Sequence, residues 1–145
     1  MASAPPKRID VPKPIDYLLP KRIRIHRFTT AGKLTKDDGA VGISVRVEAT
    51  DHFGDSGKAF GQFRFELYSF RDSNADPKGN RIRVWEVPLM DVKKNLLHWD
   101  QIARVYNFKL QCDQAIAPGQ PFVLMVVFSS PFTERRIDER KFTGE

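Results

Sequence analysis

The sequence predicts an all-β protein: an antiparallel β-sandwich of the immunoglobulin-like or Greek-key type, with about seven or eight strands. Three observations lead to this fold class. Short stretches alternate apolar and polar residues with a period of two, Gly, Pro and Asp turns separate them, and only one short segment has helical spacing. A small closed barrel is the alternative arrangement that the same pattern allows.

The clearest central strand is expected at residues 58–70, KAFGQFRFELYSF. Phe63, Phe65 and Leu67 fall on one face of the extended chain, and Arg64 and Tyr68 fall on the other. A strand with one buried and one mostly wet face needs this alternation. The phenylalanines predict a strand against which a second layer packs.

The first half of the chain contains two further expected strands. Residues 21–28 alternate Ile with Arg and His, which predicts an edge strand with a charged outer face, and residues 29–40 are expected to form a loop. The cleanest alternation lies at residues 41–50. Turn residues at 51–57 then predict a hairpin-like pair between that strand and the central one.

The second half begins with a polar loop at 71–80 and a strand at 81–87, whose apolar residues on both faces predict a bulge or burial on both sides. Residues 89–101 fit either a short helix capped by Asp91 or a loop that packs Leu96 and Trp99 inward. Three more strands are expected, the second apolar on both faces and the last a charged edge strand: residues 102–112, 121–129 and 135–143.

Charge and proline content divide the chain into a proline-rich basic arm at 1–20 and a single sandwich domain at 21–145. The net charge is +6, but residues 1–27 hold seven basic against two acidic side chains, and the rest hold 17 against 16. Nucleic-acid binding is therefore not expected, because the body of the domain is nearly neutral. The five prolines of the arm predict either a loose terminus or an extended tether, with the segment around Tyr17 docking on the body.

No pattern in the sequence predicts catalysis, a cofactor or a metal site. The chain lacks G-x-S-x-G and the glycine-rich phosphate loops, its three histidines are scattered, and its single cysteine, Cys112, is expected to pack as a small buried hydrophobe. Residues 72–76, DSNAD, resemble half of a calcium loop. Pro77 and Arg83, however, stand where that loop needs Gly and a bidentate Glu.

Arginine and aromatic residues interleave at Arg64, Tyr68, Arg83 and Trp85, which we take as a possible partner-binding set. Outward aromatic rings flanked by arginine can stack on bases, sugars or peptide rings. The alternative is cross-strand pairing that only shields the sheet.

The segments KRIRIHRFT, VRVEATDHFGD, KAFGQFRFELY, HWDQIARVYNFKL and PGQPFVLMVVFSSPFTER together resemble uncharacterised β-sandwich domains of bacterial envelope lipoproteins. The resemblance covers most of residues 18–142 and consists of strand patterning and turns, so it transfers no functional residue. Met1, before Ala2-Ser3-Ala4 and the proline-rich run, stands where a mature lipoprotein has its acylated cysteine.

The resemblance implies a non-catalytic module in the cell envelope or periplasm, possibly lipid-anchored, with a binding or structural role through protein or glycan contacts. A membrane surface would be reached only through the N-terminal arm. The alternative is an anion-binding module for nucleic acid or acidic lipid that uses the basic arm, and the alternative location is the cytoplasm.

Overall fold

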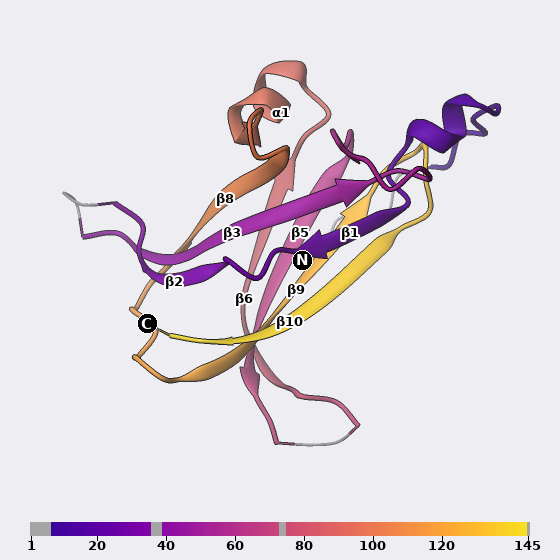
Figure 1. The fold of residues 1–145 in the computed structure, drawn as a ribbon. Helices are drawn as coiled ribbons and strands as arrows, with labels where there is room; N and C mark the ends of the chain where they lie inside the picture. The colour runs from indigo at the N-terminus through magenta and orange to yellow at the C-terminus, as the bar shows by residue number, and fades with distance from the viewer. Residues whose placement is uncertain (1–6, 36–38, 73–74, 145) are drawn as a thin grey trace.

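The computed structural model describes residues 7–35, 39–72 and 75–144. Two antiparallel sheets of six and four strands pack against each other, with 52% of residues in strands and 8% in helices (Figure 1). The predicted all-β sandwich is confirmed. The strands beyond the predicted number are short: β2, β4 and β7 have four, two and two residues.

The six-stranded sheet is organised around β3 (Val41–Thr50), which pairs with other strands along both of its edges. β1 (Arg22–Ile25) and β2 (Thr30–Lys33) follow each other along one edge. On the other edge lie β8 (Val105–Cys112) and β4 (Ser56–Gly57).

The short strand β7 (Trp99–Asp100) pairs with β8 and completes this sheet. The prediction of a loop throughout 29–40 is wrong at β2, where Ala31 is fully buried. Residues 36–38 of that expected loop lie outside the described residues.

The four-stranded sheet has the order β10-β9-β5-β6. The bounds of its strands are β5 (Gln62–Phe70), β6 (Lys78–Pro88), β9 (Pro121–Ser129) and β10 (Arg136–Thr143). β5 pairs with β6 and β9 and is the predicted central strand. β10 forms the predicted charged edge.

The predicted hairpin between β3 and β5 is wrong, because these strands lie in different sheets. The turn after β3 reverses the chain, but the reversed chain pairs with β3 only over the two residues of β4. The chain then crosses to the second layer. Both strands carry a strongly apolar face, and those faces bury each other only when the strands lie in opposite layers. Gly61 permits the crossing, since any side chain there would collide with the carbonyl of Ser129.

A cluster of aromatic side chains lies in the core between the sheets. Phe63 lies 5.0 Å from Phe128 and 5.3 Å from Phe108, and Phe65 lies 5.0 Å from Phe108, measured between ring centroids. These rings are at most 2% exposed. Burial of β9 on both faces is confirmed, because Phe122, Leu124, Val126 and Phe128 alternate with the equally buried Val123 and Val127. Cys112 packs against the edge of this core as predicted, but it is half-buried and not buried.

Side chains join the two layers along both long sides of the sandwich. On one side the carboxylate of Asp138 in β10 accepts a hydrogen bond from the backbone N–H of Ile25 in β1, at 2.7 Å. On the other, the indole N–H of Trp85 in β6 donates to the carbonyl of Gln111 in β8, at 2.9 Å. These contacts satisfy polar groups that the edges of the sheets would otherwise leave open.

The described part of the arm, residues 7–20, lies against the body and does not extend away from it. The backbone N–H of Ile9 donates to the carbonyl of Pro131 at 2.6 Å, and His52 donates in the same way to Tyr17 at 3.1 Å. Tyr17 belongs to the 3-10 helix η1 (Ile15–Leu18), and its ring lies 5.4 Å from that of His52. The predicted docking of the segment around Tyr17 is confirmed.

The only α-helix in the described ranges is α1 (Val92–His98), which follows the end of β6. Asp91 caps it, because its carboxylate accepts a hydrogen bond from the backbone N–H of Lys93 at 3.3 Å. Of the two alternatives for residues 89–101, the capped helix is therefore confirmed. No helix within 7–35, 39–72 and 75–144 has the length and apolar character that crossing a membrane requires.

Candidate functional site

The four residues predicted as a partner-binding set do not share a face of the sheet. Arg64 pairs with Glu86 across β5 and β6, whereas its neighbour Phe65 pairs with Trp85, so Arg64 and Trp85 point to opposite faces. Shifts in the pairing register on either side of Tyr68 mark the predicted irregularity. Arg83 pairs with the buried Leu67 and lies on the core side with Trp85, while Arg64 and Tyr68 lie outside.

Arg83 and Trp85 close the side of the sandwich where β6 faces β8. The guanidinium of Arg83 donates to the carboxylate of Asp113 at 3.0 Å and lies 5.6 Å from the centre of the Trp85 ring. Trp85 in turn packs against the core while its indole bonds to β8. Both side chains therefore hold the two layers together.

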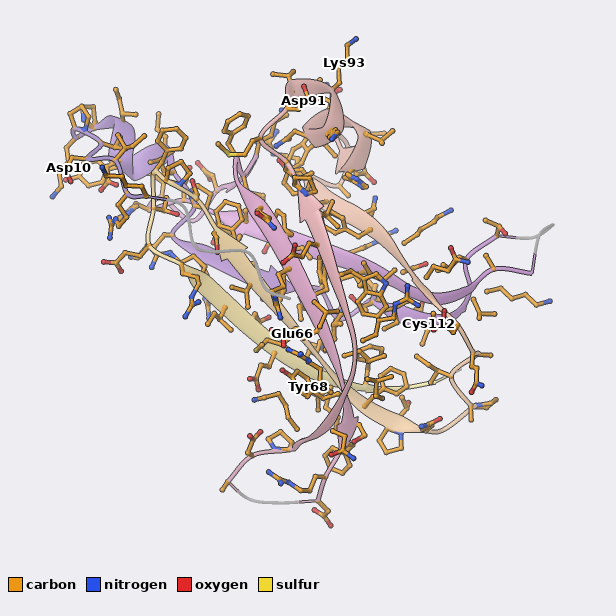
Figure 2. The ribbon with its side chains drawn as sticks, turned by 180° about the vertical axis from the view of Figure 1, so that it is seen from behind. Asp10, Glu66, Tyr68, Asp91, Lys93 and Cys112 are labelled. Atoms are coloured by element: carbon orange, nitrogen blue, oxygen red, sulfur yellow. The ribbon has the colours of Figure 1, made fainter. Side chains whose placement is uncertain are left out.

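Arg64 and Tyr68 surround Glu66 on the outer face of the four-stranded sheet, where Glu66 is only 7% exposed (Figure 2). The hydroxyl of Tyr68 donates to Oε1 of Glu66 at 2.7 Å, and Nε of Arg64 donates to Oε2 at 3.2 Å. Arg81 adds a third donor at 3.3 Å. The polar groups of the two predicted residues are thus engaged inside the protein.

These contacts also set the protonation of Glu66. Burial of its carboxyl favours the neutral acid, but the hydrogen bonds from Tyr68, Arg64 and Arg81 outweigh that effect and hold the pKa of Glu66 below its usual value. Burial and the bond to the Glu66 carboxylate raise the pKa of Tyr68. Glu66 therefore stays ionised and Tyr68 stays a donor at neutral pH.

Replacing Glu66 with Gln is expected to destabilise the fold by about 1–2 kcal/mol at pH 7, since three donors lose the buried carboxylate that accepts from them. Because the folded-state pKa is lowered, the contribution of the carboxylate is complete above the unfolded value and is lost as the pH falls through the folded one. The difference between wild type and Glu66→Gln should therefore shrink between pH 7 and pH 3 in urea unfolding experiments.

The matched control for this experiment is Glu139→Gln. Glu139 belongs to the same sheet, is exposed, and accepts from Lys78 at 2.6 Å. Its removal should change the stability little at either pH, as is usual for exposed ion pairs. An equal destabilisation by Glu66→Gln at both pH values would contradict the role given to the Glu66 carboxylate.

A buried polar cluster that the sequence did not predict connects α1 to the core. Tyr106, fully buried in β8, donates from its hydroxyl to Oδ1 of Asn95 at 2.7 Å and accepts from the backbone N–H of Ala59 at 2.9 Å. The side-chain amide of Asn95 donates to the carbonyls of Ala59 at 2.7 Å and Leu89 at 3.0 Å. Burial raises the pKa of Tyr106, which keeps the hydroxyl protonated.

Attachment through Asn95 turns the apolar residues of α1 outward. Leu96 is 51% exposed, so the inward packing that the loop alternative gave it does not occur, whereas Trp99 is half-buried against Tyr106, 5.0 Å between ring centres. A helix of seven residues makes about two turns, and its one buried residue is Asn95. An Asn inside so short a helix is a signal that could have indicated this attachment, because Asn is a poor helix former.

Replacing Asn95 with Ala is expected to destabilise the protein by about 2 kcal/mol, because two buried carbonyls and the Tyr106 hydroxyl lose a partner. Hydrogen exchange should also become faster throughout α1. Leu97→Ala, at a 78% exposed position of the same helix, is the control and should leave the free energy of unfolding almost unchanged. Equal stability of the two variants would show that Asn95 does not attach the helix.

The connections at one end of the sandwich form an exposed apolar surface. We call this surface the loop end and define it as residues 51–61, 89–104 and 130–135, with α1 at its top in Figure 1. Its exposed large apolar residues are Phe53, Phe60, Met90, Val92, Leu96, Leu97 and Ile102. The arm, docked beside it, adds Ile9, Ile15 and Leu18.

Few other apolar side chains of comparable size are exposed. In the ranges that the structure describes they are Phe28, Ile82 and Ile137. At the loop end, a shallow hollow of about 160 Å³ lies between Phe60, Val92 and Leu96, with Lys58 at its rim and Asn95 beneath. The arrangement offers a surface for contact and carries no acid–base pair.

The described residues hold no group of three or more His, Cys, Asp or Glu side chains arranged to bind a metal. In the calcium-like segment, Asp76 accepts from the backbone N–H of Lys78 at 3.0 Å, and Ser73 and Asn74 lie outside the described residues. The three histidines contact different partners: Phe28 for His26, Tyr17 for His52 and Phe108 for His98.

Comparisons with known proteins add no relative to this description. No family model matches the chain, and neither the curated proteins nor the solved structures contain a significant match.

Proposed function

We propose that this protein is a non-catalytic β-sandwich module of a bacterial envelope protein and that it works by binding another protein through the loop end. The observation that carries the proposal is the distribution of exposed apolar side chains, which lie at the loop end and on the adjacent arm except for Phe28, Ile82 and Ile137. Large contiguous apolar patches mark interaction sites in soluble domains. The envelope setting depends on the likeness to lipoprotein domains.

The charges around the loop end favour a protein partner over a membrane. Lys58, Lys93 and Lys94 are interspersed with Asp91 and Asp100 around the apolar residues. An apolar centre with a rim of mixed charge is the anatomy of a protein–protein interface. An anionic lipid surface would repel the two carboxylates, and lipid tails would bury them.

A glycan is a poorer fit, because sugar rings stack on open aromatic faces. The Trp of this surface, Trp99, is half-buried, and its ring is covered by Lys58 at 4.8 Å and Arg104 at 5.8 Å from the centroid. The flexible side chains that remain exposed are aliphatic or single Phe rings. Exposed apolar side chains of this kind match the apolar centre of a protein interface.

The loop end is also held in place before any partner arrives. The carboxylate of Asp100 accepts from the backbone N–H groups of Ile102 at 3.0 Å and Ala103 at 2.9 Å, and the guanidinium of Arg104 donates to the carbonyl of Ser56 at 2.7 Å. These bonds fix a turn whose tip, Ile102, is 97% exposed. A fixed turn lowers the entropy lost on binding.

Photo-crosslinking in the native cells tests the proposal. A photoreactive phenylalanine analogue at Leu97 should give a covalent adduct with one other protein, identified by mass spectrometry. The same analogue at Ile82, which is 58% exposed on β6, is the control and should not give it. The proposal is wrong if Leu97 gives no adduct, if both positions give the same one, or if the adduct contains a lipid or a second copy of this chain.

A further inference from the structure

The edge strands β1 and β10 lie side by side along one long side of the sandwich (Figure 1). A hollow of about 360 Å³ opens at their seam. Its lining is basic: Arg24, Ile25, His26, Arg27 and Arg140. No carboxylate of residues 7–35, 39–72 and 75–144 lines it. Four of these residues come from β1 and the segment after it, and Arg140 comes from the opposite layer.

A break in the edge of the six-stranded sheet creates this lining. β1 pairs with β3 as far as Ile25 and Val47, and β2 resumes at Thr30 and Ser44, so four residues lie opposite two. The backbone N–H of His26 donates to the carbonyl of Arg46 at 2.7 Å, which keeps the broken edge attached to β3. The extra length bulges out at the seam and brings His26 and Arg27 into the hollow.

Positive charge exceeds negative charge among the groups around the hollow. The neighbouring strands add Arg46 and Glu48 from β3 and Asp138 from β10. Both carboxylates are already engaged, Glu48 with Arg24 at 2.9 Å and Asp138 with the backbone N–H of Ile25 at 2.7 Å.

Arg27 and Arg140 make no ion pair with any carboxylate of the described residues. Counting Arg24, Arg27, Arg46 and Arg140 against Glu48 and Asp138, cations outnumber anions by two.

His26 is placed to serve as a further donor. The backbone N–H of Phe28 donates to Nδ1 of His26 at 3.2 Å, which leaves Nε2 to carry the proton of the neutral ring. Burial and the nearby guanidinium of Arg24, together with those of Arg46 and Arg27, lower the pKa of His26, although Glu48 opposes them. Burial is the largest cause of this lowered pKa, and the three guanidiniums together outweigh Glu48.

We propose that this hollow binds the phosphate group of a ligand, with Arg27 and Arg140 as the principal partners and Arg24 and His26 as further donors. Guanidinium groups bind phosphate oxygens through paired N–H donors. Arg27, whose guanidinium lies 4.9 Å from the centre of the Phe28 ring, and Arg140 come from opposite layers and can hold one phosphate between them. The hollow is larger than a single phosphate, so the group arrives on a larger molecule. None of these residues belongs to the loop end or the arm, so this site is independent of the proposed protein interface.

The test is an NMR titration of the His26 ring with inorganic phosphate and pyrophosphate, at constant ionic strength maintained with chloride. Wild type should show a saturable shift, with pyrophosphate binding more tightly than phosphate, and bound anion should raise the pKa of His26. Arg27→Gln with Arg140→Gln should weaken binding at least roughly tenfold, the value of one lost charged hydrogen bond or more.

Arg22→Gln with Lys141→Gln is the matched control, because it removes the same charge from β1 and β10 at positions outside the hollow. It should bind as wild type does. A shift that never saturates, or equal losses in the two double variants, would overturn the proposal, because either would indicate general charge screening.

Vesicles distinguish the two sources of a phosphate group. Sedimentation with phosphatidylglycerol vesicles, compared with phosphatidylcholine vesicles, should show binding that Arg27→Gln with Arg140→Gln abolishes if the ligand is a lipid headgroup. Pyrophosphate binding without binding to either vesicle assigns the hollow to a soluble phosphorylated ligand. Vesicle binding that survives in Arg27→Gln with Arg140→Gln, without a saturable pyrophosphate shift, would contradict the site.

Discussion

Phe65→Ala is expected to lower the free energy of unfolding by about 3–5 kcal/mol, as removal of a fully buried aromatic ring does when the cavity cannot collapse. Phe65 has no exposed surface, and its ring packs on Phe63 and Phe108 at 6.1 and 5.0 Å between centroids. These neighbours come from both sheets, so the loss affects the contact between the layers. Denaturation with guanidinium chloride, followed by tryptophan fluorescence and circular dichroism, measures it.

Phe53→Ala is the matched control, because it removes the same side chain from a turn where the ring is 66% exposed. Its effect should stay below about 0.5 kcal/mol, as for most surface substitutions. A loss of less than about 1 kcal/mol for Phe65→Ala would mean that the inward face of β5 is assigned incorrectly.

Much of the fold could be predicted because the inward residues of several strands keep a strict period of two. The inward residues of β3, Ile43, Val45 and Val47, are at most 1% exposed, and Phe63 and Phe65 of β5 are fully buried. The edge strand β10 could be predicted from its charged residues, because a strand with so many charged side chains cannot be covered by an apolar layer. Alternation reports which face of a strand is buried, and that information is local.

Alternation does not report which strands pair, and this explains the error at the turn after β3. Residues 51–57 have the composition of a hairpin turn, and they do form a short hairpin between β3 and β4. After the two residues of β4, however, the chain changes to the other layer. The edge strand β2 was missed because its sequence, TAGK, contains only Ala31 as an inward apolar residue. Its pairing is determined by β3.

The candidate binding residues show the same limit. Arg64 and Tyr68 alternate as outward residues should, but their contacts with Glu66 depend on a neighbouring strand that contributes Arg81. The outward turn of α1 depends on Asn95 meeting Tyr106, eleven residues away and in another element. A spacing rule that places Leu96 inward assumes that an apolar stripe faces the core. In α1 the contact with the core is instead the buried hydrogen bond between Tyr106 and Asn95.

The central claim is that this protein binds its partner through the loop end, and the most direct measurement compares two triple variants. Val92→Ser, Leu97→Ser and Ile102→Ser remove three apolar side chains from the loop end, whose exposed fractions are 65%, 78% and 97%. Phe28→Ser, Ile82→Ser and Ile137→Ser remove the three that are exposed elsewhere. Both variants should keep wild-type unfolding curves, because all six positions are exposed.

The quantity to measure is the dissociation constant for the protein that crosslinks to position 97, titrated against each purified variant. The loop-end variant should bind roughly a hundredfold more weakly, as expected when three apolar anchors each contribute about 1 kcal/mol, and the other variant should bind as wild type does. Equal affinity for the two variants, or a greater loss in the variant altered at positions 28, 82 and 137, would contradict the account.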